Sequence, residues 1–186
     1  MNDPQIVLEG QLRECYGRVV YTHKTHEKCA DILFTCHKRI KFWQIALSAL
    51  VTGGILTTLF PDYKAPATAF SAICSTILLA LNSYTKDYDL GEIAQKHRRA
   101  AADLWSIREA YLSLLTDIRV GGLDLQTIRD KRDELATALH TLYVGAPSTN
   151  FKAYEKAQKA LQESGDMTFS DSEVDAFLPK ELKRRQ

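Results

Sequence analysis

Three side chains that could bind a metal ion lie three residues apart in the N-terminal part of the chain: His23, His26 and Cys29. On a helix this spacing brings them onto one face. A structural zinc site needs four such ligands, and the sequence offers no second cluster to complete the set. We therefore interpret the three as core or interface residues, and we predict no metal ion and no other cofactor.

Motifs of the common active sites are missing from the sequence. The chain has no Gly-rich phosphate loop, no nucleophile elbow and no HExxH pair, and its carboxylates are scattered along predicted helix surfaces. The 24 Lys and Arg residues against 23 Asp and Glu give a net charge of +1, whereas nucleic-acid binding needs a clear basic excess. We predict that the protein is not an enzyme and does not bind nucleic acid directly.

The composition predicts an all-α fold. Only 9 Gly and 5 Pro occur in 186 residues, too few for the closely spaced turns of a sandwich or a barrel. The cysteines form no CxxC pair, which indicates a reduced, cytosol-facing protein. There are four of them: Cys15, Cys29, Cys36 and Cys74.

Two runs of residues, 42–61 and 65–85, contain no charged side chain. Each has about 20 residues, which as a helix is roughly 30 Å long and matches the hydrocarbon core of a bilayer. Only a three-residue turn centred on Tyr63 lies between them, so we predict a transmembrane hairpin with these two spans. The alternative is a soluble bundle with a buried hairpin, because the runs also carry polar residues.

Basic residues flank the two runs on one side. Nine Lys or Arg lie within 18 residues of the outer ends, whereas the connecting turn has Lys64 alone. This positive-inside pattern predicts a protein embedded in the lipid bilayer with both termini in the cytosol. The predicted juxtamembrane cations are Lys38, Arg39, Lys41 and Lys86.

Helical periodicity continues on both sides of the hairpin, because apolar residues recur there at alternating steps of three and four. The two arms have similar lengths, so we expect long antiparallel cytosolic helices that continue the hairpin inward. The predicted regions are an N-terminal cytosolic helix over 1–41, the transmembrane hairpin over 42–85, a cytosolic helix over 86–120 and a C-terminal helical region over 123–186.

An antiparallel hairpin centred on Tyr63 determines which residues face each other. Residues equally far from Tyr63 should pair, to within one helical turn, which places His23 near Asp103 and His37 near Asp89. Carboxylates beside these histidines would favour their protonation. We therefore expect the arms to hold together better at mildly acidic pH.

Small and polar residues form rows along both predicted spans. Small residues let transmembrane helices approach closely, and we expect the hairpin to pack through Ala46, Ala49, Gly53, Ala67, Ser71 and Ser75. The polar residues either join copies of the chain or line a wet path, and their pattern leaves both roles open. The residues predicted to form a polar ring or pore are Gln44, Ser48, Thr52 and Asn82.

Longer stretches resemble one protein family, the SLATT proteins, which are the SMODS- and SLOG-associating two-transmembrane effectors of bacterial conflict systems. The likeness covers nearly the whole chain, and a two-helix hairpin alone would not be specific enough to suggest it. The stretches that carry it are Lys24–Asp31, Trp43–Gly54, Lys86–Glu92, Leu104–Glu109, Thr168–Asp171 and Phe177–Leu182.

The resemblance implies a membrane effector of antiphage defence. Such a protein would form a homo-oligomer in the bacterial inner membrane and form or gate a pore, causing abortive infection when a companion sensor signals. The companion would be a nucleotide-signalling protein of the nucleotidyltransferase or reverse-transcriptase type, and no catalytic residues carry over. The alternative is a non-lethal membrane anchor or adaptor for a defence enzyme.

Overall fold

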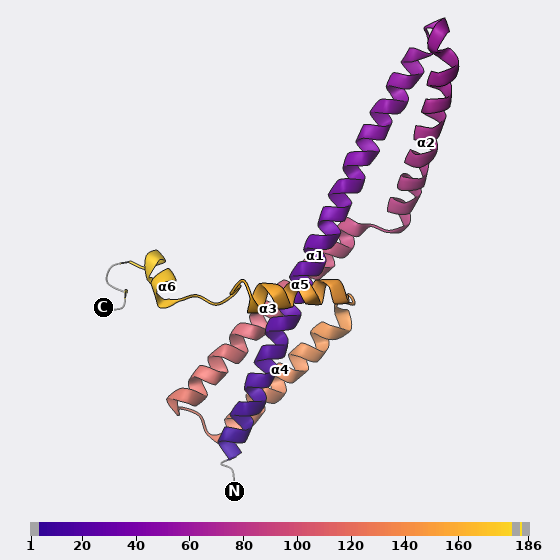
Figure 1. Cartoon of the computed structure of the whole chain (residues 1–186). Helices are drawn as coiled ribbons and strands as arrows, with labels where there is room; N and C mark the ends of the chain where they lie inside the picture. The colour runs from indigo at the N-terminus through magenta and orange to yellow at the C-terminus, as the bar shows by residue number, and fades with distance from the viewer. Residues whose placement is uncertain (1–3, 180–182, 184–186) are drawn as a thin grey trace.

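The computed structural model describes residues 4–179 and residue 183, and this part of the chain is helical and contains no strand, as the composition predicts. The first three residues of the predicted N-terminal helix and residues 180–182 and 184–186 of the C-terminal region lie outside the described residues. Figure 1 shows two helix pairs that share one long helix.

The shared helix, α1 (Pro4–Thr57), has 54 residues and is about 80 Å long. It runs through both the predicted cytosolic arm and the first predicted span without interruption. At its C-terminal end the short 3₁₀ helix η1 (Pro61–Tyr63) turns the chain into α2 (Lys64–Asp87), which packs back along α1. Figure 1 shows this hairpin extending away from the other helices.

The returning leg of the hairpin has a break that the sequence analysis did not anticipate. A single helix was expected from residue 86, but α2 ends at Asp87 and α3 (Leu90–Val120) begins after Tyr88 and Asp89. The Asp89 carboxylate accepts a hydrogen bond from the Glu92 backbone N–H at 3.0 Å. This N-cap satisfies a first-turn donor and therefore favours a new helix start at this position.

The other helices begin and end at residues with defined capping geometry. Gly121 ends α3 with a φ of +80°, the left-handed conformation that glycine adopts without strain. The next three helices each begin with an N-cap residue whose side-chain oxygen accepts a hydrogen bond from a first-turn backbone N–H group. The three N-cap residues are Asp124, Asn150 and Ser170. These helices are α4 (Leu125–Gly145), α5 (Phe151–Gln162) and α6 (Asp171–Phe177).

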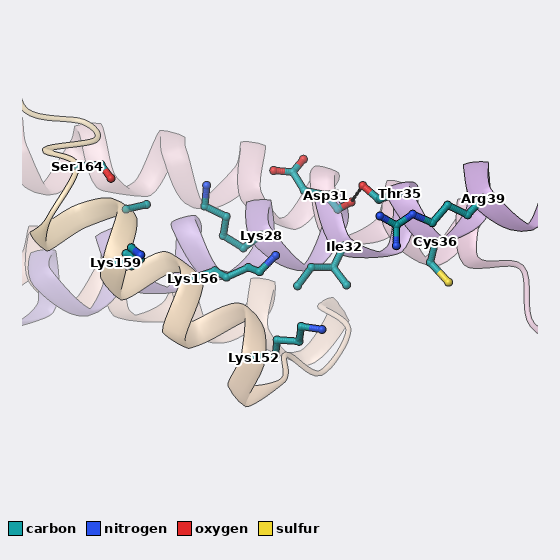
Figure 2. Close-up of a pocket in the computed structure, with 11 residues that line it drawn as sticks. Lys28, Asp31, Ile32, Thr35, Cys36, Arg39, Lys152, Lys156, Lys159 and Ser164 are labelled. Atoms are coloured by element: carbon teal, nitrogen blue, oxygen red, sulfur yellow. Dashed lines mark hydrogen bonds between the residues drawn. The ribbon is translucent and has the colours of Figure 1, made fainter.

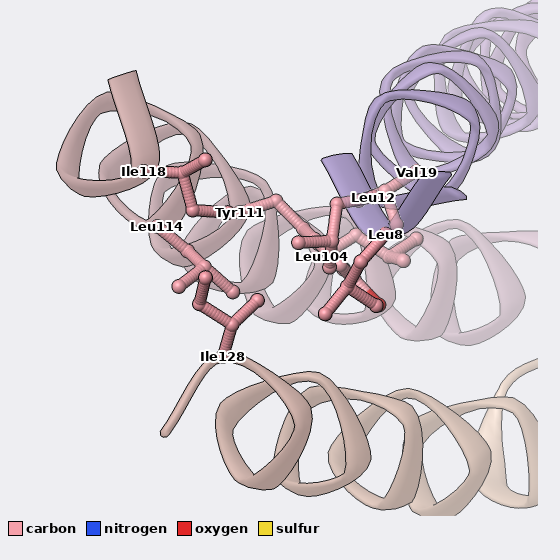
Figure 3. Close-up of a cluster of buried hydrophobic side chains, with 8 residues drawn as sticks. All are labelled: Leu8, Leu12, Val19, Leu104, Tyr111, Leu114, Ile118 and Ile128. Carbon is pink, nitrogen blue, oxygen red and sulfur yellow. The ribbon is translucent and has the colours of Figure 1, made fainter. Parts of the chain in front are cut away.

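The hydrophobic core lies at the end of the molecule far from the hairpin turn, between α1, α3 and α4 (Figure 3). Full burial of each large apolar side chain stabilises the fold by about 1.5–3 kcal/mol, so this cluster holds the two arms and α4 together. Its buried members are Leu8, Leu12, Val19, Leu104, Tyr111, Leu114, Ile118 and Ile128.

The antiparallel register of α1 against α2 and α3 is the one that the central turn predicts, to within one helical turn. In the arms, the His23 ring nitrogen Nδ1 lies 2.8 Å from the Ala101 carbonyl oxygen. In the spans, the Gln44 and Asn82 side chains meet, as their equal separation from the turn predicts. The predicted pairing is therefore confirmed in both halves of the molecule.

Candidate functional site: the membrane hairpin and the histidine cluster

Two helical stretches of the described residues are long and apolar enough to cross a membrane, one in α1 and one in the chain that includes α2. Only 11% and 17% of these apolar windows are buried inside the chain. The core helix of a soluble bundle would be mostly buried, so this exposure favours the bilayer over the soluble alternative. The outward side chains include Ile45, Leu50, Ile55, Phe70, Ile73 and Leu79.

The two spans are in close contact at Gly54. A Cβ atom added to Gly54 would collide with the Ser71 hydroxyl oxygen and would lie 3.6 Å from the Ala67 carbonyl. Leu47 and Cys74 are also buried between the spans. Small residues at such a contact let two transmembrane backbones pack closely.

The six predicted packing residues divide into two groups. Ala67 and Ser71 are buried within the hairpin and Ala46 is half-buried, whereas the other three, Ala49, Gly53 and Ser75, are exposed. A Cβ atom at Gly53 would meet no atom within 4 Å. Within one chain the glycine at the helix contact is therefore Gly54, one residue further along α1 than predicted.

A polar layer joins the two spans near the end where the basic residues lie. The Gln44 Nε2 group donates to Asn82 Oδ1 at 2.9 Å and to Thr85 Oγ1 at 3.1 Å. The register predicts the first pair, and Thr85 is an additional member. These two bonds use both N–H donors of Gln44. Within the described residues no hydrogen-bond partner is found for the Gln44 side-chain oxygen Oε1 or for the exposed Asn82 side-chain nitrogen Nδ2.

The hydroxyl groups of the polar stripe have partners within their own helix. Ser48 donates to the backbone carbonyl oxygen of Gln44 at 2.8 Å, and Thr52 donates to the backbone carbonyl oxygen of Ser48 at 3.0 Å. A hydroxyl bonded in this way can face lipid at low cost. The carboxamides are therefore the polar groups of the stripe that still need a partner.

The four juxtamembrane cations, Lys38, Arg39, Lys41 and Lys86, are exposed at the same end of the spans as the polar layer. Aromatic side chains accompany them, with Phe42 and Trp43 in edge-to-face contact and Tyr84 stacked on Tyr88. Aromatic rings and basic residues are typical of the boundary between lipid and cytosol.

A cluster of three buried histidines lies between the apolar core and the membrane: His23, His26 and His97, which we call the histidine cluster. The Nδ1 atoms of His26 and His97 are 2.9 Å apart, so one donates and the other accepts. Cys29 instead contacts the N-cap residue of α5, with its Sγ 3.9 Å from the Asn150 Nδ2 group. Within the described residues no three His, Cys, Asp or Glu side chains are placed together so that they could hold a metal ion.

Burial and the charges of His97 and His23 lower the pKa of His26 to about 4. Burial also lowers the pKa of His97. Protonation of these two histidines is therefore unfavourable in the folded chain. The stabilisation at acidic pH expected from His23 and His37 beside carboxylates stays a prediction. The hairpin register pairs His23 and His37 with carboxylates, but it does not indicate that His26 of one arm faces His97 of the other.

Comparison with known families gives one match. The model of SMODS and SLOG-associating 2TM effector domain family 4 matches residues 8–173, which is most of the chain. Neither a curated protein nor a solved structure gives a significant match. The matched region includes both spans, the polar layer and the histidine cluster.

The contact at Gly54 predicts different results for two adjacent glycines. Gly54→Leu should lower the free energy of unfolding in detergent by about 1–3 kcal/mol, because the new side chain forces the spans apart. Gly53→Leu is the matched control, since it adds the same group to the same helix in open space. Thermal unfolding measures both variants, and equal stability would contradict the contact.

The histidine cluster predicts a loss of stability in acid. The pKa of His26 is about 4 in the folded state against 6.5 for a free histidine. The stability that neutral His26 contributes to the fold is therefore fully present above pH 6.5. It is lost as the pH drops towards 4, because the unfolded chain binds the proton more readily than the folded chain. We expect the free energy of unfolding to fall by about 2 kcal/mol between pH 7.5 and pH 5. Chemical denaturation in detergent at each pH measures this change.

A matched pair of variants separates this effect from other titrations. His26→Gln should flatten the pH dependence over the same range, whereas His140→Gln, at an exposed position on α4, should leave it as in the parent. Stability that rises on acidification, or a His26→Gln variant with the parent's pH dependence, would contradict the role of the cluster.

Proposed function

We propose that this chain, which belongs to SMODS and SLOG-associating 2TM effector domain family 4, assembles through its membrane hairpin and opens a path through the bilayer when a companion protein signals. It is a membrane protein with a two-span effector domain. The homo-oligomer, the pore and the identity of the companion belong to the proposal. So do placement in the bacterial inner membrane and a role in abortive infection.

The observation that carries the proposal is the unfinished hydrogen bonding of the polar layer. Gln44 and Asn82 form one hydrogen bond with each other within a single chain. The side-chain oxygen of Gln44 and the side-chain nitrogen of Asn82 remain without a hydrogen-bond partner among the described residues. Unpaired polar groups inside a bilayer are costly, and two helices cannot enclose them or a water path. A ring of hairpins would supply the missing partners and surround an opening.

The cytosolic helices provide the surface on which a companion could act. The arms and α4 share one apolar core, and α5 packs across α1 near the membrane end of the arms. A companion of the nucleotidyltransferase or reverse-transcriptase type would act on this unit directly or through a product. Because α1 continues into the membrane, a change in the arms reaches the polar layer along a single helix.

Labelling of cysteines tests the proposed orientation. A Tyr63→Cys variant should react with an impermeant maleimide added to intact cells, because the turn would lie outside. The native Cys36 is exposed on the cytosolic arm and serves as the internal control. It should react only after the membrane is permeabilised, and its labelling in intact cells would overturn the orientation.

Replacement of the two carboxamides tests the assembly. A Gln44→Leu, Asn82→Leu double variant should still insert, but its oligomer should be about tenfold or more weaker, because each intramembrane hydrogen bond contributes roughly 0.6–2 kcal/mol. Crosslinking measures the oligomer, and a membrane-potential dye measures depolarisation on induced expression. We expect both signals to be lost together.

Thr76→Val is the matched control, because it removes a hydroxyl group from the same span as Asn82. This hydroxyl already donates a hydrogen bond to the Ala72 carbonyl oxygen of its own helix. It should assemble and depolarise like the parent. If the double variant also behaves like the parent, the polar layer only packs the hairpin. If the parent never depolarises cells under any trigger, the chain is a membrane anchor or adaptor.

A further inference from the structure

A groove of about 650 Å³ lies between α1 and α5, close to the membrane end of the arms (Figure 2). Its volume is in the range of small-molecule sites. Most of the charged side chains that line it are basic: Lys28 and Arg39 from α1, and Lys152, Lys156 and Lys159 from α5. The chain as a whole has a net charge of only +1, so this concentration of cations is local.

The lysines of α5 owe their position to a repeated Lys–Ala pair. Ala153, Ala157 and Ala160 are the buried residues of α5, and each follows directly after a lysine. Because successive helix positions differ by 100°, all three lysines lie along the same edge of the buried alanine face. Figure 2 shows Lys156 extending from α5 towards Ile32 of α1.

Three contacts hold α5 against α1 and so keep the groove formed. Gln162 Nε2 donates to the Tyr21 hydroxyl at 2.7 Å, and the rings of Tyr21 and Tyr154 are stacked. Beyond the end of α5, Lys24 forms an ion pair with Asp166 at 3.0 Å. The cations from the two helices are therefore held close together despite their mutual repulsion.

The carboxylates near the groove do little to neutralise it. Among the described residues, Asp31 is the one acidic side chain that lines it, and it pairs with Arg98 of α3 at 3.2 Å. Lys159 is 3.9 Å from Glu163. Within the described chain no carboxylate lies within 4.0 Å of the other four lining cations, Lys28, Arg39, Lys152 and Lys156. The groove therefore has an excess of positive charge that an anion could balance.

We propose that the groove between α1 and α5 binds a soluble ligand that carries two or more phosphate groups. Lysine and arginine side chains from two helices can contact several phosphate oxygens at once. A ligand with a single carboxylate or phosphate group would not need so many cations. Ile32 and Ala160 add apolar surface for the remainder of an organic ligand. The inference uses the membrane position of the hairpin and does not depend on pore formation.

The position of the groove favours a soluble ligand over a lipid headgroup. Lys28 precedes the first span, which begins at Phe42, by 14 residues, or about 20 Å of helix. The headgroup region reaches only about 5–7 Å beyond the hydrocarbon core. Arg39 lies within that distance, but the part of the groove that contains Lys28 does not. A ligand that contacts cations at both ends must therefore come from the cytosol.

Binding of sodium tripolyphosphate to the purified full chain in neutral detergent tests the proposal by calorimetry. We expect a 1:1 complex whose affinity falls as salt rises. A Lys152→Gln, Lys156→Gln double variant should bind at least tenfold more weakly. A Lys96→Gln, Lys131→Gln double variant loses the same charge from exposed positions outside the groove and should change the affinity less than twofold.

A second arm distinguishes the lipid source. Tripolyphosphate should raise the thermal transition of the parent and the control variant but not of the groove variant, and phosphatidylglycerol mixed into the micelles should affect all three proteins equally. If phosphatidylglycerol instead stabilises the parent and the control variant but not the groove variant, the proposal is overturned in favour of a lipid headgroup. Equal affinity of all three proteins for tripolyphosphate would show that the groove is not a phosphate site.

Discussion

The uninterrupted helix α1 is the constraint on which the rest of the structure depends. It pairs with α2 in the membrane hairpin and with α3 in the arms, so one rigid element sets the register of both pairs. The polar layer at Gln44 and the histidine contact at His26 lie on this same helix, 18 residues apart. Rotation of α1 in the arms must therefore also rotate its membrane span, unless the helix itself bends.

The returning leg is built differently, because it is divided at Tyr88 and Asp89. Asp89 caps α3, so the arm has its own stable start and does not rely on hydrogen bonds from α2. The outgoing half of the hairpin is thus one continuous helix, whereas the returning half is divided into α2 and α3 at the level of the membrane boundary. In an assembly of hairpins, α2 could change its neighbours while α1 and α3 keep their pairing.

Sequence patterns were sufficient for the features that depend on local chemistry and on chain geometry. The end of α3 at Gly121 and the start of α6 at Ser170 follow from backbone conformation and capping. The pairing of Gln44 with Asn82 follows from their equal separation from a short turn. The choice of Gly54 over Gly53 could not be predicted, since adjacent residues differ by 100° around the helix and both spans carry small residues on several faces. The packing of α5 on α1 also depends on three-dimensional contacts between residues more than 100 positions apart in the chain.

The histidine cluster, with its predicted response to pH, and the groove that we propose binds an anion lie in the same part of the arms, and the packing there explains why. The apolar core ends near Val19 and Leu104, and beyond it the arms meet mainly through small or polar residues such as Ala30, Ala94 and the histidine cluster. An alanine buries far less apolar area than a leucine, so each contact contributes less free energy. The free energy that holds the arms together here is therefore small, so protonation of a histidine or binding of an anion can change their packing. Such a change would act on α1, the helix that continues to the polar layer. Regulation of the proposed effector is most readily located in this segment.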